Sequence, residues 1–346
     1  MTYLLPLITS FIFSIIAIML LKPVAFHFQL VDRPNKRKLH NGSIPLIGGI
    51  TIFFGVALSL LIFVPINETF FYYLTSAFII LILGVGDDKF DLSVRGRLLI
   101  QVLTAMLMTT SAGFYLHDFG NIFYFFKLEL GSFGVIITVF AVIACINAFN
   151  MIDGIDGLAG MLSLITFTAL TILLTFSHPT WAVIPIIFIG SLLAYLIFNL
   201  RWPFKNVGKI FLGDAGSMLV GLTIVWLLVI GVESETQAFR PVTALYLIAI
   251  PLMDMAAIMI RRIKKGTSPF KADREHLHHI FERAGISRKR TLIYIALCAS
   301  IIATAGVVSE FYLVPEWIML VGFVGVFLLY NYALIHSWKI IRWYKS

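Results

Sequence analysis

Eleven runs of mostly apolar residues dominate the sequence, each near the length needed to cross about 30 Å of hydrocarbon. They cover approximately residues 3–21, 46–66, 70–86, 98–116, 132–149, 158–176, 181–199, 217–231, 241–260, 291–308 and 318–335. Hydrophobic residues make up 60% of the chain and charged residues 13%, a composition that soluble domains do not have. The sequence therefore predicts one all-α, polytopic membrane domain over residues 1–346 with about eleven transmembrane helices.

The placement of Lys and Arg predicts the orientation, because basic residues are retained on the cytoplasmic side of a membrane. Of the 26 Lys and Arg residues, only Lys127 and Arg240 fall outside one alternating set of connections and the C-terminal tail. We expect an outside N-terminus and a cytoplasmic C-terminus. The expected cytoplasmic loops are approximately 22–45, 87–97, 150–157, 200–216 and 261–290. This asymmetry explains the net charge of +8 without nucleic acid binding.

Two adjacent acids, Asp87 and Asp88, directly follow the third apolar run in the string GVGDDKFD. Carboxylates this close repel each other unless a cation or a proton lies with them. The alternative is a solvated loop start in which Lys89, Arg95 and Arg97 are the partners. This motif alone does not decide between the two interpretations.

The fifth apolar run ends in NAFNMIDGIDG, which holds two amides and two acids but no Lys or Arg. If the segment is helical, Asn147, Asn150, Asp153 and Asp156 share roughly one face. Such a face suits a hard cation or sugar hydroxyls. A helix end with Asx turns explains the glycines but not two acids without a neutralising neighbour, so a functional role is favoured.

Asp214, in the string FLGDAGS, lies just before the eighth apolar run, at its cytoplasmic end. Taken alone it could be an ordinary helix N-cap. The charge count nevertheless places it on the same side as the other acids, where folding can bring them together. Carboxylate oxygens of this kind suit Mg²⁺ or Mn²⁺.

The last inner loop contains DREHLHHIFERAG, which predicts a short helix with Asp273 as N-cap and Gly285 after its end. Its apolar face is Leu277, Ile280, Phe281 and Ala284. The polar side chains left over are Arg274, His276, His278, His279 and Arg283. A zinc site is disfavoured because no thiolate accompanies the histidines, and we expect donors to phosphate or uracil instead.

Three further features have both a functional and an ordinary interpretation. Lys36 and His40 in the first inner loop add positive charge, which the positive-inside rule also explains. Gly48 and Gly49 would let a ligand or another helix approach closely. Asp254, inside the ninth run, is a functional candidate as an intramembrane acid, although a nearby inner Arg could pair with it.

Taken in order, GVGDDKFD, NAFNMIDGIDGL, FLGDAGS and DREHLHHIF resemble the polyprenyl-phosphate N-acetylhexosamine-1-phosphate transferase family, glycosyltransferase family 4. The resemblance covers nearly the whole chain. The muramoyl-pentapeptide branch typically has three consecutive histidines before Phe, whereas this chain has His278-His279-Ile280-Phe281. That departure argues for the GlcNAc branch, which begins O-antigen and enterobacterial common antigen synthesis.

The resemblance implies a metal-dependent enzyme of the bacterial inner membrane that transfers GlcNAc-1-phosphate from UDP-GlcNAc to undecaprenyl phosphate. The implied products are undecaprenyl-pyrophosphoryl-GlcNAc and UMP. The implied catalytic residues are Asp87, Asp88, Asp153, Asp156, His278 and His279. The expected substrate-binding residues are Asn150, His40, Lys36, Arg274 and His276. The implied metal ligands are Asp214 and Asp88, with Mg²⁺ or Mn²⁺ as the ion.

Direct attack by the lipid phosphate is the preferred mechanism, because a phosphate monoester with a second pKa of about 6 is largely dianionic at neutral pH. A carboxylate base at Asp87 or Asp88 and a covalent intermediate are the alternatives. Other UDP-HexNAc donors and UDP-MurNAc-pentapeptide stay open, and so does homo-oligomerisation. The rival from another class, a cation-coupled transporter, predicts mid-span acids and repeat symmetry. Every one of the candidate acids except Asp254 lies instead at the inner end of a run, and the sequence has no fixed-period repeat.

Overall fold

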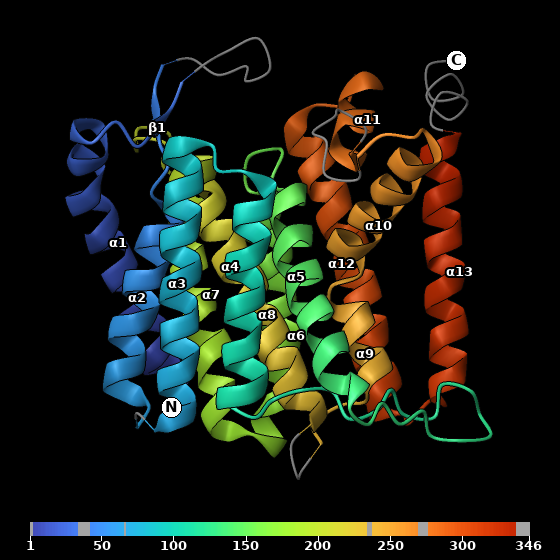
Figure 1. The fold of residues 1–346 in the computed structure, drawn as a ribbon. Coiled ribbons are helices and arrows are strands. Elements are labelled where there is room, and N and C mark those ends of the chain that lie inside the picture. The colour runs from blue at the N-terminus through green and yellow to red at the C-terminus, as the bar shows by residue number, and fades with distance from the viewer. Residues whose placement is uncertain (1–2, 34–41, 66, 234–236, 269–275, 337–346) are drawn as a thin grey trace.

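The computed structural model describes residues 3–33, 42–65, 67–233, 237–268 and 276–336. These residues form thirteen α-helices, one π-helical turn and a two-stranded antiparallel hairpin. Most of the helices lie side by side with their axes roughly aligned and form a single bundle (Figure 1). The prediction of an all-α, polytopic membrane protein is confirmed, with the short hairpin as its only strands in this part of the chain.

Every predicted apolar run falls on one helix or on two consecutive ones. The elements of the first half are α1 (Leu4–His27), β1 (Val31–Asp32), β2 (Ile44–Pro45), α2 (Gly48–Phe63), α3 (Glu68–Phe90), α4 (Val94–Met106), the π-helical turn (Leu107–Ser111) and α5 (Phe133–Ile152). Those that follow are α6 (Leu158–Ser177), α7 (Pro179–Leu200), α8 (Gly213–Glu233), α9 (Pro241–Leu247), α10 (Ala249–Lys264), α11 (Leu277–Arg283), α12 (Arg288–Phe311) and α13 (Glu316–Ile335).

Eight helices in the described residues are long and apolar enough to span a membrane, and α9 with α10 passes the same test as one broken segment. The break bends the pair by 84°. Pro251 lacks the N–H that would bond to the Leu247 carbonyl, and Thr166 Oγ1 donates to that carbonyl instead at 2.8 Å. Because α2 and α4 are shorter, the number eleven stays a prediction.

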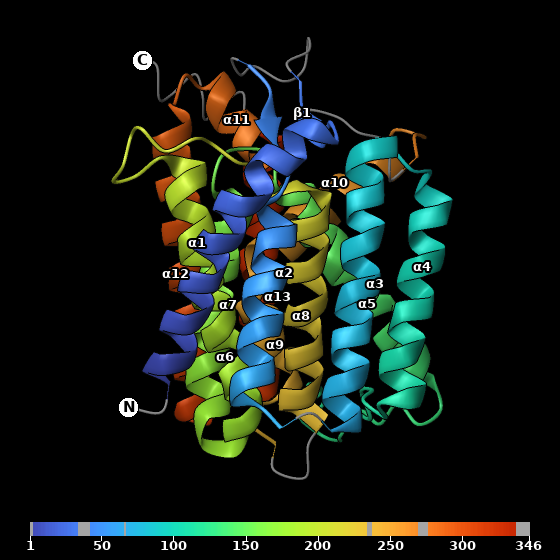
Figure 2. The same cartoon turned by 90° about the vertical axis from the view of Figure 1, so that its left-hand side faces the viewer.

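The central helix is α8, whose most apolar window is completely buried. It packs against α2, α3, α5 and α6, and Figure 2 shows it behind α2. Glycines bring the backbones together. A Cβ on Gly49 would lie 2.2 Å from the Gly216 nitrogen, and one on Gly84 would lie 2.2 Å from the Ala215 Cα. For Gly49 this confirms the helix-packing interpretation.

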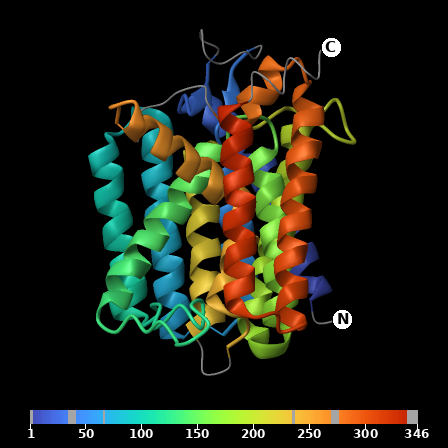
Figure 3. The same ribbon diagram turned by 90° about the vertical axis from the view of Figure 1, so that its right-hand side faces the viewer.

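The segments predicted to be cytoplasmic gather at one end of the bundle, together with the hairpin and α11, whereas the N-terminal end of α1 lies at the other (Figures 1 and 3). Three of the predicted loops have wrong boundaries. Helix α3 continues to Phe90 and α4 begins at Val94, so the expected loop 87–97 is mostly helical. Helices α1 and α10 also extend into their expected loops, to His27 and Lys264.

Cysteine labelling tests the predicted sidedness. Ser93, Asn206 and Thr267 are exposed at the end that holds the predicted cytoplasmic loops, and Asn121 and Thr180 are exposed in the opposite connections. We expect single cysteines at the first three positions to react with an impermeant maleimide only in inverted vesicles. The other two should react in intact cells. Labelling of Asn206→Cys and Thr267→Cys from opposite sides would contradict a common face.

Candidate active site

The adjacent acids lie in the last turn of α3. Asp87 accepts hydrogen bonds from Arg97 Nη1 at 2.5 Å and from the Leu92 N–H at 2.9 Å. The helix ends at Phe90, its C-cap Asp91 has left-handed backbone geometry with φ 52°, and Ser93 then caps α4. Arg97 on α4 is therefore the partner of Asp87 among the three basic residues that the sequence offered.

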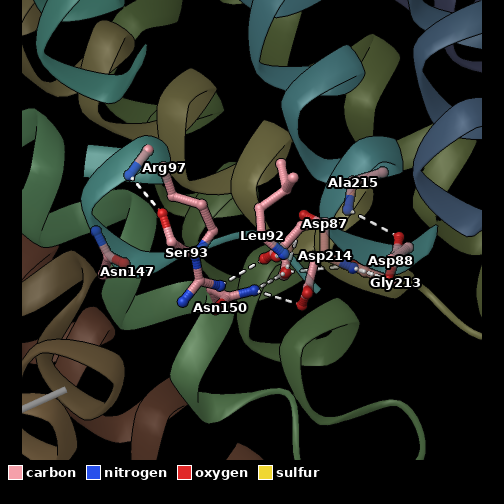
Figure 4. A network of polar contacts seen from close by, with 12 residues as sticks. Asp87, Asp88, Leu92, Ser93, Arg97, Asn147, Asn150, Gly213, Asp214 and Ala215 are labelled. Atoms are coloured by element: carbon pink, nitrogen blue, oxygen red, sulfur yellow. Dashed lines mark hydrogen bonds and ion pairs between the residues drawn. The ribbon is translucent and has the colours of Figure 1, made fainter. Parts of the chain in front are cut away.

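Asp88 caps the amino end of α8, far away in the sequence. Its Oδ1 accepts from the Asp214 N–H at 2.9 Å and its Oδ2 from the Ala215 N–H at 3.3 Å (Figure 4). A helix amino end favours negative charge, because its first N–H groups have no partner within the helix. Gly213 makes room for this contact: its φ is +72°, and a Cβ there would lie 2.5 Å from Asp88 Oδ2.

Asp214 occupies the first turn of α8 and faces α5. Asn150 Nδ2 donates to Asp214 Oδ1 at 2.8 Å and to Ser217 Oγ at 3.0 Å. The Asp214 carboxyl also lies beside that of Asp87, close enough for the two charges to interact (Figure 4). Three helices, α3, α5 and α8, thus bring Asp87, Asp88, Asn150 and Asp214 into one cluster. Asp88, rather than Asp214, is therefore the side chain that caps the amino end of α8.

The expected helical face of Asn147, Asn150, Asp153 and Asp156 does not form, because α5 ends at Ile152, before the two acids. Asp153 is the C-cap with ψ 58°, and Asp156 lies in the following turn. Asn147 Nδ2 points to α4, where it donates to Gln101 Oε1 at 2.8 Å. Asn150 is therefore the amide of this segment that joins the acid cluster.

Asp153 lies half-buried between the acid cluster and the turn that holds Asp156. Burial raises the pKa of Asp153 to about 7, with further contributions from the charges of Asp214 and Asp156. A carboxyl with a pKa near neutrality can take up or release a proton at physiological pH.

The sequence predicts that Asp156 has no neutralising cation, but the structure provides one. Lys209 Nζ lies 2.6 Å from Asp156 Oδ2 and 4.9 Å from the centre of the Phe211 ring. Lys209 comes from the connection between α7 and α8, and no motif singled it out. Its position five residues before Asp214 was the one available signal.

The histidine segment forms α11 (Leu277–Arg283), whose N-cap is His276 rather than the predicted Asp273. Its first flanking residue is His276, and Asp273 lies outside the described residues. The predicted apolar face is confirmed: Ile280 is buried, and Leu277 and Phe281 pack against the core of the bundle. Gly285 follows the helix with φ +84°, as expected.

His278 lies against the connection between α5 and α6. A Cβ on Gly154 would lie 2.0 Å from His278 Nε2, and the ring is 1% exposed. Neither ring nitrogen has a hydrogen-bond partner within the described part of the chain. Burial lowers the pKa of His278 to about 3, helped by the neighbouring His279 and His276. The ring is therefore neutral at pH 7 and carries a single N–H that a ligand could accept from.

The other histidines have different surroundings. His279 Nδ1 lies 3.1 Å from Glu282 Oε2, and Glu282 also accepts from Arg288. His276 Nδ1 lies 2.7 Å from Asp254 Oδ2, so the predicted pairing of Asp254 with an Arg is replaced by a histidine contact. The expected substrate-binding residues Lys36, His40 and Arg274 lie outside the described residues.

Within the described residues, no group of three or more His, Cys, Asp or Glu side chains is arranged to hold a metal ion. The donor chemistry of the cluster still fits Mg²⁺ or Mn²⁺, because Asp87, Asp88 and Asp214 supply carboxylate oxygens whose like charges a cation would relieve. Arg97 already compensates Asp87, and backbone N–H groups compensate Asp88. Asp214 is therefore the first candidate for a ligand.

The acid cluster lies in the part of the chain that matches a known protein family. A family model described as glycosyl transferase family 4 matches residues 70–232, the segment that carries Asp87, Asp88, Asn150 and Asp214.

The chain also matches known proteins over nearly its full length. An undecaprenyl-phosphate alpha-N-acetylglucosaminyl 1-phosphate transferase of Haemophilus influenzae is 44% identical over 99% of this chain and 96% of its own length. Proteins of the same name from Salmonella typhimurium and Escherichia coli K12 are 44% and 42% identical, over 100% and 98% of this chain and 94% and 93% of their own lengths.

The raised pKa of Asp153 predicts a pH-dependent stability. The folded state holds the proton up to about pH 7, whereas an unfolded carboxyl loses it near pH 4, so this group's contribution to stability falls as the pH rises between those values. Asp153→Asn cannot ionise. In EDTA, it should raise the thermal unfolding midpoint in detergent more at pH 8 than at pH 5. Equal shifts at both values would contradict the assignment.

Proposed function

The chain belongs to glycosyl transferase family 4, and from this premise we propose that it transfers GlcNAc-1-phosphate from UDP-GlcNAc to undecaprenyl phosphate. The products are UMP and undecaprenyl-pyrophosphoryl-GlcNAc. The observation that carries the proposal is the convergence of Asp87, Asp88, Asn150 and Asp214 at the amino end of a buried helix. The choice of UDP-GlcNAc rests on the names of the full-length relatives.

The reaction we propose is an in-line displacement. An oxygen of the lipid phosphate attacks the β-phosphorus of the donor, the bond from that phosphorus to the bridging oxygen breaks, and UMP leaves with the bridging oxygen. Two anionic substrates must approach each other, so neutralisation of charge is the main task of the site. A divalent cation held by Asp214 and Asp88 would supply such neutralisation and would polarise the diphosphate.

The side chains of the chain itself have separable roles in this proposal. Asp153, with a pKa of about 7, accepts the proton that a monoanionic lipid phosphate still carries. Asp88 stays fixed at the amino end of α8 and keeps Asp214 in place. His278 is neutral and donates one N–H to a phosphate oxygen. Lys209 contributes positive charge beside Asp156.

We also place this site on the cytoplasmic side of a bacterial inner membrane. The basic connections collect at the same end of the bundle as the acid cluster, as the positive-inside rule requires for cytoplasmic loops. A site at this boundary can receive a soluble nucleotide sugar from the cytosol. The lipid can keep its phosphate at the interface while its chain stays among the helices.

A direct assay tests the donor and the cation. Purified protein with undecaprenyl phosphate should release UMP from UDP-GlcNAc faster than from UDP-GalNAc, UDP-glucose or UDP-MurNAc-pentapeptide. EDTA should abolish the release, and Mg²⁺ or Mn²⁺ should restore it. Asp214→Asn should lose at least about 10²-fold in turnover, because the amide keeps the shape but not the charge. Full activity in EDTA would contradict the proposed requirement for a divalent cation. Faster release of UMP from another UDP-sugar would contradict the choice of UDP-GlcNAc as the donor.

Gly154→Ala tests the role of His278. Gly154 does not need a left-handed backbone, so the added methyl group acts mainly by displacing the buried imidazole that lies 2.0 Å from it. A shift of about 1 Å in a positioned group can cost about 10²-fold in rate, and we expect a loss in kcat of at least tenfold. Gly325→Ala is the matched control, because nothing lies within 4 Å of its Cβ. Equal turnover of the two variants would exclude His278 from the site.

A further inference from the structure

Asp254 is a carboxylate that the proposed reaction does not use. It lies on α10, it is 1% exposed, and Ala257, Ile280 and Leu334 form a small apolar cluster nearby on α10, α11 and α13. These three elements lie next to one another at the end of the bundle that holds the acid cluster (Figures 1 and 3). An ionisable side chain in such surroundings is costly unless it is paired, so its partners indicate what it does.

Three donors surround this carboxylate. His276 Nδ1 lies 2.7 Å from Oδ2, while Oδ1 accepts from the Leu277 N–H at 3.1 Å and from the Tyr330 hydroxyl at 2.7 Å. Two of the three come from the start of α11, and the third comes from α13. An ionised carboxylate only accepts, so His276 carries its proton on Nδ1. The carboxylate thus fixes both the start of α11 and the tautomer of His276.

The contact continues from His276 to the proposed site. The His276 and His278 rings are nearly parallel, with an interplanar angle of 13° and centroids 5.6 Å apart. His278 in turn lies against Gly154, which is next to Asp153. A continuous series of contacts therefore leads from Asp254 through two imidazole rings to the connection between α5 and α6.

We propose that Asp254 is a positioning residue of the transferase, which acts through His276 to hold the histidine helix α11 against the active site. The inference rests on the proposed function. Asp254 does not touch a substrate in this account. Its role is to give His276 one tautomer and one orientation, and so to seat His278 beside the phosphates.

A double-mutant cycle tests the inference in the full-length protein. Asp254→Asn keeps the shape, but its NH₂ can point at His276 Nδ1 and favour the opposite tautomer. It should lower kcat/KM for UDP-GlcNAc by about tenfold to hundredfold, by analogy with the loss of a carboxylate that orients a metal-bound histidine. In a His276→Ala background, the same substitution should change kcat/KM by less than about twofold. An equal loss in both backgrounds would overturn the route through His276.

Two further variants separate positioning from mere stability. Asp254→Glu keeps the buried charge but moves the carboxylate by one methylene, so it should fold and still lose kcat/KM; wild-type kcat/KM in this variant would overturn the proposal even if Asp254→Asn does not fold. Glu310→Gln is the matched control. Glu310 pairs with Arg240 Nε at 3.0 Å between α9 and α12, away from the histidine helix. It should lower the unfolding midpoint and leave turnover per folded molecule unchanged.

The proposed function and this inference fail differently. If wild-type protein releases no UMP from UDP-GlcNAc, the proposed function fails. If wild-type protein is active and Asp254→Asn matches it in kcat/KM, only the positioning role of Asp254 fails.

Discussion

The close approach of α3 to the amino end of α8 is the contact on which the rest of the site depends. Gly84 lets the two backbones meet without an intervening side chain, and Gly213 leaves space for the Asp88 carboxylate over the first N–H groups of α8. The amino end of a buried helix needs acceptors that the helix cannot supply. Asp88 supplies them, and Asp214 is thereby placed beside Asp87 and Asn150.

The acids of the site are distinguished by how their charges are compensated. Asp87 has Arg97, Asp88 has two backbone N–H groups, and Asp156 has Lys209. Asp153 instead has burial and like charges around it, and its pKa is correspondingly raised to about 7. Carboxyl groups of one residue type can therefore serve as a fixed cap, a cation ligand and a proton acceptor within one cluster.

Much of this arrangement could be predicted from the sequence, because its determinants are local. Apolar runs long enough to span a membrane locate the helices, and the distribution of Lys and Arg indicates which connections share a side. The acidic and histidine motifs, taken in order, then indicated the family, which the comparisons confirm. The choice of a hard cation came from carboxylate chemistry and stays a prediction.

Two of the errors concern pairs of residues that are distant in the sequence, and others concern the ends of helices. Lys209 neutralises Asp156 across 53 positions, and His276 reaches Asp254 across 22, which no local spacing reveals. The end of α5 at Ile152 was missed because the three-residue spacing of the polar side chains continues past it. Tertiary contacts form the two distant pairs: the loop between α7 and α8 folds back onto the turn after α5, and α11 packs on α10.

The central claim is that a sugar and the phosphate attached to it move together onto the lipid. The most direct measurement uses UDP-GlcNAc with radioactive phosphorus at the β position and radioactive carbon in the sugar, incubated with purified protein and undecaprenyl phosphate. Both labels should enter the lipid in equal amounts, and the nucleotide product should be unlabelled UMP. Carbon in the lipid with phosphorus left in UDP would contradict the account, because it would show transfer of the sugar alone.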